Sequence, residues 1–195
     1  MSEPRNPGPA KSTTSKPAAK LGTFTARDSV TIERLLPASA EAVWDYLTNP
    51  SRLRTWLAGG TVDLRKGGII ALNFDLIDCP GREDMHGTMQ GTITACEPPR
   101  LLAYTWGENE TRGRGIPDSL VTFELQPAAK GQTLLRLTHK RLAPKDMSPV
   151  AAGWHAHVDV LLARLENREP RPFNDSYESL EPQYHAALIA SGHKA

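Results

Sequence analysis

The sequence predicts an α+β fold in which a curved antiparallel sheet of about seven strands wraps around one long C-terminal helix. The first observation is a series of short runs between residues 61 and 140, in which apolar and polar residues alternate and turn residues intervene. The second is a stretch with apolar residues at helical spacing over residues 150–167. As a helix this stretch is roughly 27 Å long, enough to lie across a whole sheet and cover its concave face.

Composition sets the broad class of the protein. The 195 residues are enough for one domain with a buried core, and 39% hydrophobic and 23% charged residues are typical of globular chains. The net charge is +1 and the basic residues are scattered, so the sequence predicts no basic surface for binding nucleic acid. No apolar run is long enough to cross a membrane. Cys79 and Cys96 form no metal-type or disulfide framework, so a reducing cytoplasm is the expected location.

The chain divides into a tail and one domain. Residues 1–22 are rich in Pro, Ser, Thr, Lys and Ala, so they bury too little apolar surface to offset the entropy cost of ordering. We predict that they form a disordered tail. Residues 23–192 are predicted to form a single domain, since no internal repeat is evident.

The domain is predicted to begin with a strand followed by two short helices. Residues 30–33 alternate between apolar and polar, as in a half-buried strand. Ser39 is a suitable N-cap for a helix over residues 40–48. Asn49 and Pro50 begin the second helix, with proline at the first helical position.

Strands are predicted through the middle of the chain and helices at its end. Lys66-Gly67-Gly68 and Pro98-Pro99 mark turns between successive strands. The expected strands are 61–65, 69–76, 86–97, 102–106, 120–126 and 133–140. A long helix is expected from residue 150, after Pro144 and Pro149, and a final helix between Tyr177 and Leu188 is expected to pack outside it.

Four stretches, in this order and spacing, carry a resemblance to a known family. They are Ile32-Glu33-Arg34 through Val43-Trp44 with Trp56-Leu57, Gly91-Thr92-Ile93 through Thr105-Trp106, Leu137-Thr138-His139 through Leu142, and Gly153-Trp154-His155 through Leu165. Together they resemble the START-like (SRPBCC) superfamily of helix-grip proteins. Within it, they are similar to the AHSA1-like branch, which is related to the C-terminal domain of the Hsp90 ATPase activator.

This resemblance implies an antiparallel sheet that grips a long C-terminal helix, with a cavity between them. Members of the superfamily bind hydrophobic small molecules, catalyse cyclisation or hydrolysis, or act as co-chaperones. The Hsp90 activator also has a separate N-terminal domain for which this chain has no room, which weakens the expectation of Hsp90 stimulation. Fold alone does not decide among these roles.

Large rings on the inward faces are the candidate lining of the cavity. Tyr104 and Trp106 share the apolar face of one strand, and aromatics supply a large contact area with a polar tip. A purely structural role in the core is the alternative, above all for a tryptophan on an inner helical face. The expected lining is Trp56, Phe74, Tyr104, Trp106, Phe123, His139, Trp154, His155 and His157.

The histidines are also candidates for chemistry. His155 and Asp159 lie one helical turn apart, so the carboxylate can orient or charge the imidazole for proton transfer. The alternative is a half-exposed pair that aids packing and solubility. His139 ends a strand on its apolar face, which favours a buried, hydrogen-bonded structural role. His155 and His157 point about 200° apart on a regular helix, so they cannot chelate one ion and no metal site is expected.

The sequence thus predicts a protein that binds an apolar or aromatic small molecule, without an assigned reaction, catalytic residue, cofactor or metal. An enzyme of the same fold that uses a helix histidine for acid–base chemistry stays open. So does a co-chaperone or interaction protein that uses the outer sheet face or the charged loop 108–115. Besides the ligand, the expected partners are a second copy of the chain, paired through the sheet edges, and a chaperone.

Overall fold

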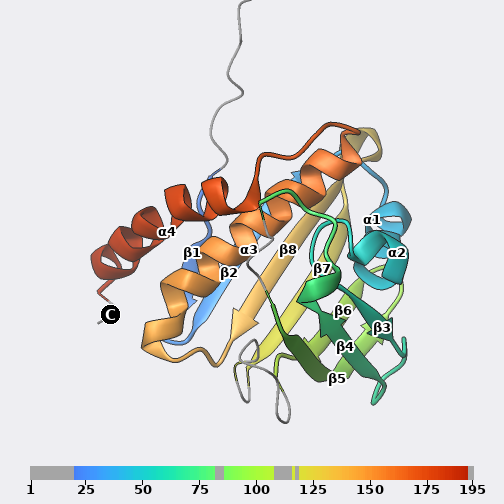
Figure 1. Cartoon of the computed structure of the whole chain (residues 1–195), viewed down its shortest axis with the longest axis horizontal. Coiled ribbons are helices and arrows are strands. Elements are labelled where there is room, and N and C mark those ends of the chain that lie inside the picture. Colours follow the sequence, from blue (N-terminus) through green and yellow to red (C-terminus); the bar gives the residue numbers. More distant parts are fainter. Residues whose placement is uncertain (1–19, 82–85, 108–115, 117–118, 193–195) are drawn as a thin grey trace, which may run out of the picture.

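The fold is described from a computed structural model, which places residues 20–81, 86–107, 116 and 119–192. The tail predicted for residues 1–22 therefore lies outside the described residues up to residue 19, as does the whole of the loop 108–115. The described residues form the α+β fold that the sequence predicts. One curved antiparallel sheet surrounds a long C-terminal helix (Figure 1).

The sheet has eight strands in the spatial order β1-β2-β8-β7-β6-β5-β4-β3. Their bounds are β1 Thr23–Ala26, β2 Ser29–Leu36, β3 Gly59–Val62, β4 Ile69–Asn73, β5 Thr88–Glu97, β6 Leu101–Thr105, β7 Leu120–Pro127 and β8 Thr133–Lys140. The predicted count of about seven was one too low, because β1 has no recognisable pattern in the sequence. This edge strand is four residues long and mostly exposed, so it lacks the apolar alternation that marks the other strands.

Four α-helices complete the domain: α1 Ala40–Thr48, α2 Pro50–Leu53, α3 Pro144–Leu165 and α4 Phe173–Ala190. Both short helices begin as the sequence predicts. The Ser39 hydroxyl accepts a hydrogen bond from the Ala42 amide at 3.3 Å, and the Asn49 side chain caps α2. They follow two strands, β1 and β2, and not one as predicted.

Helix α3 begins at Pro144, earlier than the predicted residue 150. A proline fits the first turn of a helix, where its missing amide hydrogen has no intrahelical partner in any case. Pro149 lies further along and forgoes one backbone hydrogen bond without ending the helix. With this earlier start, α3 has 22 residues and is long enough to cross the sheet.

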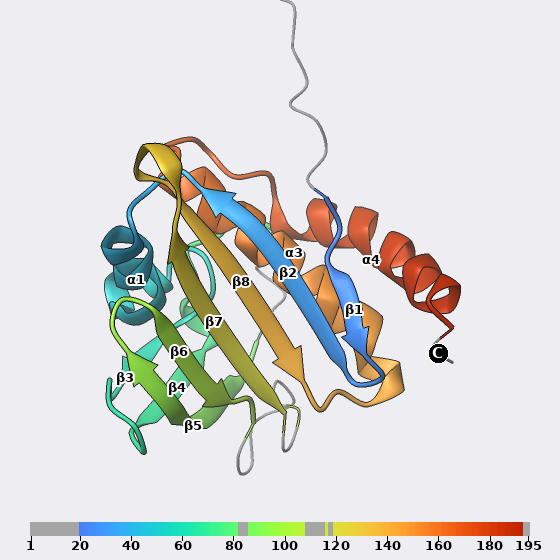
Figure 2. The ribbon, with the colours of Figure 1, turned by 180° about the vertical axis from the view of Figure 1, so that it is seen from behind.

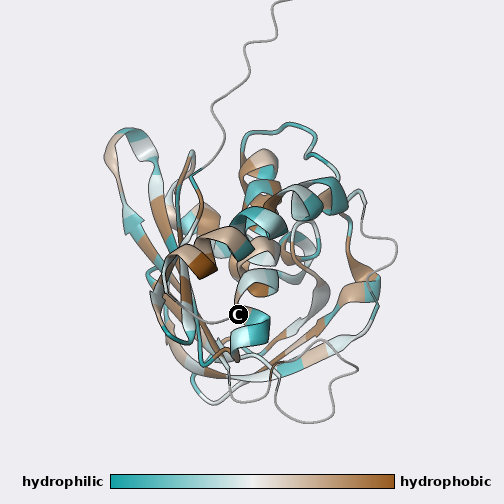
Figure 3. Ribbon diagram, turned by 90° about the vertical axis from the view of Figure 1, so that its left-hand side faces the viewer, coloured by the Kyte–Doolittle hydropathy of each residue, from teal (hydrophilic) through white to brown (hydrophobic). Residues whose placement is uncertain are grey.

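The helices lie in the concavity of the sheet. Helix α3 runs diagonally across the concave face, while α4 lies beside it toward β1 (Figure 1). The convex face of the sheet carries no helix over β8 and β7 (Figure 2). Seen end-on, the sheet curves around the helices, and apolar and polar residues alternate along its strands (Figure 3). Within the described part of the chain, no helix has both the length and the apolar character needed to cross a bilayer.

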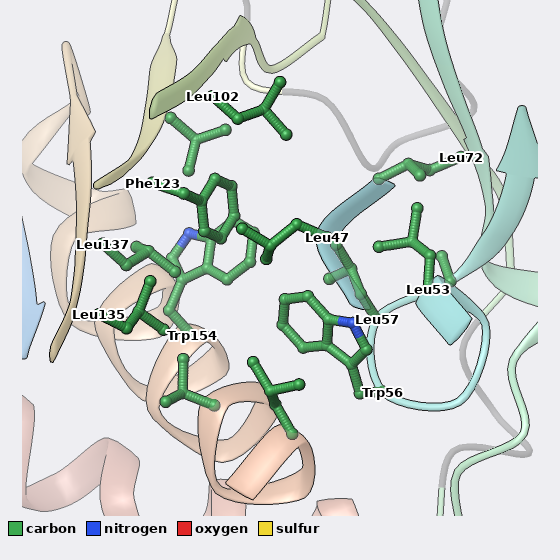
Figure 4. Packing of buried hydrophobic residues seen from close by; sticks show 14 of the residues in the cluster. Leu47, Leu53, Trp56, Leu57, Leu72, Leu102, Phe123, Leu135, Leu137 and Trp154 are labelled. Atoms are coloured by element: carbon green, nitrogen blue, oxygen red, sulfur yellow. The ribbon is translucent and has the colours of Figure 1, made fainter. Parts of the chain in front are cut away.

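The main core fills the space between α3, the sheet and the two short helices. Trp154 from α3 meets Phe123, Leu135 and Leu137 from the sheet, while Trp56 closes the other side from the end of α2 (Figure 4). A smaller core lies between α3, α4 and β2. Its buried members are Val30, Leu142, Met147, Ala151, Ala152, Tyr184 and Leu188.

Candidate ligand-binding cavity

The indole of Trp154 is the centre of an aromatic cluster between α3 and the sheet. Side chains along a strand point alternately to its two faces. This alternation places Phe123 of β7, and Trp106 just beyond β6, on the face that α3 covers. The Trp154 ring lies edge-on to both, with centroids 4.9 Å from Trp106 and 5.7 Å from Phe123. Edge-to-face contacts of this kind add stabilisation to that from buried apolar area, so they strengthen the packing of α3 on the sheet.

A hydrogen bond fixes the protonation state of His139 in β8. The Trp154 Nε1–H donates to His139 Nδ1 at 2.9 Å, so Nδ1 is an acceptor and the ring proton resides on Nε2. That nitrogen lies 3.0 Å from the hydroxyl of Ser119. Burial lowers the pKa of His139 to about 3, so the imidazole is neutral near pH 7. His139 is the buried, hydrogen-bonded histidine that the sequence favoured.

A cavity of about 150 Å³ remains beside this cluster. Three of its walls come from the sheet side: Phe74 at the end of β4, Trp106 and His139. The helix contributes Val150, Gly153, Trp154 and His157, which recur at i, i+3, i+4 and i+7 and so form one stripe of α3. The cavity is therefore lined by aromatic rings and by one face of α3, and it is open to solvent on the side of the half-buried Val150 and Gly153.

His157 is held in a defined orientation at the cavity wall. Its Nδ1 lies 2.7 Å from the carbonyl oxygen of Trp56, which can only accept, so Nδ1 carries a proton. Its ring centroid lies 4.7 Å from that of Phe173, at the start of α4. These contacts tie the cavity wall to the two short helices and to α4.

Four of the nine predicted lining residues lie elsewhere. Trp56, Tyr104 and Phe123 are buried in the core next to the cavity, and Tyr104 stacks on Phe123 with centroids 6.0 Å apart. His155 lies on another face of α3. The structure thus brings Phe74, Trp106, His139, Trp154 and His157 together, and their role in binding stays a prediction.

His155 belongs to a polar cluster between α3, α4 and β2. Its Nδ1 is 2.9 Å from the Tyr184 hydroxyl, and its Nε2 is 3.5 Å from Asp159. Asp159 also accepts a hydrogen bond from Arg34 at 3.1 Å. Burial first, and then the charge of Arg34, lower the pKa of His155 to about 4. The predicted His155–Asp159 pair exists, but it lies outside the cavity, and the pair is buried on the histidine side where a half-exposed position was expected.

The sequence reasoning missed Val150 and Gly153. A signal was present, because both residues share the helical stripe of Trp154 and His157, and glycine is unusual in a helix interior. The pattern does not show which face of the helix borders a cavity, because that depends on how α3 crosses the sheet.

A second hollow lies on the convex face of the sheet. It has a volume of about 530 Å³ and combines charged side chains with apolar ones. Its walls come from the start of α1, the turn at Pro99 and Arg100, and the outward residues of β7 and β8. Arg136 on its rim is paired with Glu33 at 2.8 Å. In the described ranges, no group of three or more His, Cys, Asp and Glu side chains is placed to hold a metal ion.

Comparison with known proteins identifies the family. No curated protein matches the chain. A solved protein of Bordetella parapertussis is 36% identical, with a TM-score of 0.69, and the match covers 86% of this chain and 89% of that one. CalU16 from Micromonospora echinospora is 26% identical, with a TM-score of 0.62 and coverage of 83% and 88%.

The Aha1 dimer from Colwellia psychrerythraea shares the fold at 18% identity, with a TM-score of 0.55 and coverage of 71% and 96%. The model of one protein family matches residues 37–166, which run from the end of β2 through α3 and include every residue that lines the cavity. The chain belongs to the family described as Activator of Hsp90 ATPase homolog 1-like protein.

Proposed function

We propose that the protein binds one small, flat, neutral molecule in the cavity under α3. The observation that carries this proposal is the size and lining of the cavity, about 150 Å³ walled mainly by aromatic rings. A dry apolar cavity of about 150 Å³ binds a guest the size of benzene, whereas pockets for drug-sized ligands are about 300–1,000 Å³. The volume of about 150 Å³ therefore favours a guest with a single ring.

The hydrogen bonds around the cavity support a neutral guest. The indole N–H of Trp154 is used by His139, and the Nε2 of His139 faces Ser119. Trp154 and His139 therefore present ring faces and edges to a guest. The same burial that lowers the pKa of His139 disfavours any charge placed beside it. Phenols and other neutral aromatics fit this chemistry, and carboxylates do not.

Thermal unfolding of the full chain with phenol, toluene and benzoate tests the proposal. Phenol and toluene are expected to raise the melting temperature, because a ligand at a hundredfold excess over its Kd adds about 2.7 kcal/mol. Benzoate, which has the same ring and a charge, is the matched control and is expected to leave it unchanged. Tryptophan fluorescence should report the same binding, since Trp106 and Trp154 line the cavity. Unchanged melting and fluorescence at millimolar phenol and toluene would contradict the proposal.

The other roles stay predictions. An acid–base enzyme would now rely on His157, the helix histidine at the cavity. The homodimer paired through the sheet edges is supported by the Aha1 dimer, a structure of the same fold solved as a dimer, and the chaperone contact rests on the family resemblance alone. The outer sheet face, where the sequence predicts a protein partner, carries the larger of the two hollows. The cytoplasmic location is likewise a prediction from the cysteine content.

A further inference from the structure

We infer that Gly153 sets the size of the guest, because the guest's ring lies flat against the bare helix backbone at this position. The inference rests on the proposed binding function and deepens it. Gly153 lies within α3, on the stripe that lines the cavity, between Val150 and Trp154. It is only half-buried, while its neighbours Ala152 and Trp154 are buried.

Packing does not explain this glycine. A Cβ atom built on Gly153 would have no heavy atom of the described residues within 4 Å. The contrast with the sheet glycines is sharp. A Cβ at Gly91 would lie 1.8 Å from the carbonyl oxygen of Thr105, and one at Gly60 would lie 1.9 Å from that of Ala71. Those two positions require glycine, whereas Gly153 has room for a side chain.

Backbone conformation does not explain it either. Gly67, Gly131 and Gly192 also have open space around them, but each has a positive φ of 70–79°, which favours glycine. Gly153 has ordinary helical backbone, in which glycine is less favourable than alanine. Among the glycines whose surroundings the structure describes, Gly153 is thus the one that neither crowding nor φ accounts for.

Gly153 lines the cavity, so the open space on its inner side is part of the cavity. Val150 precedes Gly153 on the helical stripe and Trp154 follows it, while Phe74 and Trp106 line the cavity from the sheet side with centroids 6.4 Å apart. A side chain at residue 153 would occupy the place of a guest. Residues that lower stability are common at functional sites. Here a glycine that is unfavourable in a helix leaves one wall of the cavity without a side chain.

The test compares Gly153→Ala and Gly153→Leu with the wild type, using phenol as the probe. Gly153→Ala is expected to raise the melting temperature of the free protein by about 2–4 °C, because alanine is the better helix former and meets no clash. It should weaken phenol binding at least tenfold, and Gly153→Leu should abolish the phenol-induced shift. Ala186→Gly, at an exposed position of α4, is the matched control: it should lower the melting temperature and leave phenol affinity unchanged.

The double variant Gly153→Ala with Ala186→Gly separates affinity from stability. It is expected to melt near the wild-type temperature and still to bind phenol at least tenfold more weakly. If the wild type binds phenol and the Gly153 variants bind it equally well, the inference is overturned while the proposed function stands. If the wild type binds neither phenol nor toluene, the proposed function itself fails. A Gly153→Leu variant that does not fold leaves the alanine and double variants to decide.

Discussion

One tryptophan side chain has two roles at the residue scale. The ring of Trp154 packs against Trp106 and Phe123 between α3 and the sheet, and its N–H holds His139 in one tautomer. The cavity lies beside this ring, and the preceding residue of the lining stripe is Gly153. Affinity for a guest and stability of the fold are therefore both expected to depend on this residue.

Replacing Trp154 by phenylalanine should destabilise the protein by roughly 2–3 kcal/mol. The change leaves a void and strands the buried acceptor His139 Nδ1 without its donor. Trp44→Phe is the matched control, since it makes the same chemical change on α1, outside the aromatic cluster, and should cost less. Urea denaturation measures both. Equal losses for the two variants would show that the hydrogen bond to His139 contributes little.

The sequence predicted which rings face inward but not which of them reach the cavity. Alternation along the strands placed Tyr104 and Phe123 on the inner face, and both are indeed buried. Only the crossing position of α3 decides that Trp106 borders the remaining space while those two are covered. His155 and His157 are two residues apart on the helix, so they face different partners, Tyr184 for the first and the Trp56 carbonyl for the second. These hydrogen-bond partners are distant in the sequence, so local sequence patterns cannot predict them.

At the scale of elements, a chain of hydrogen bonds joins α3, α4 and the segment before β1. With His155 neutral, the Tyr184 hydroxyl donates to its Nδ1 and accepts from the Gly22 amide at 2.7 Å. Arg34 connects Asp159 to the carbonyl oxygen of Lys20 at 3.1 Å. These bonds explain how a short edge strand and an outer helix stay on the domain. They link residues far apart in sequence, so no local pattern predicts them.

Tyr184→Phe should loosen α4 and the segment before β1 together. Loss of the hydroxyl removes the acceptor of the Gly22 amide and a partner of the buried His155, at a cost of about 1–3 kcal/mol. Hydrogen exchange should show the Gly22 amide and the β1–β2 ladder losing protection before β7 and β8. Tyr177→Phe changes another α4 tyrosine, one that stacks on Phe173, and should leave Gly22 protected. Unchanged exchange at Gly22 in Tyr184→Phe would contradict this account.

At the scale of the whole molecule, two buried neutral histidines couple stability to pH. Burial lowers the pKa of His139 to about 3, and burial with Arg34 lowers that of His155 to about 4. In the unfolded chain an imidazole has a pKa of about 6.5. Between these values the unfolded state binds more protons than the folded state, so stability rises with pH. The stabilisation is complete above about pH 6.5 and is lost as the pH falls toward the folded values.

Guanidinium denaturation between pH 7.5 and 5 tests this coupling. Stability should fall below about pH 6.5 with a slope of about 1.4 kcal/mol per pH unit for each of the two histidines, before most carboxylates titrate. His155→Gln should remove about half of that slope, because one of the two titrating groups is gone. His185→Gln changes an exposed α4 histidine and should retain the full slope. A wild-type stability that is flat from pH 7.5 to 5 would mean that neither imidazole is kept neutral by the fold.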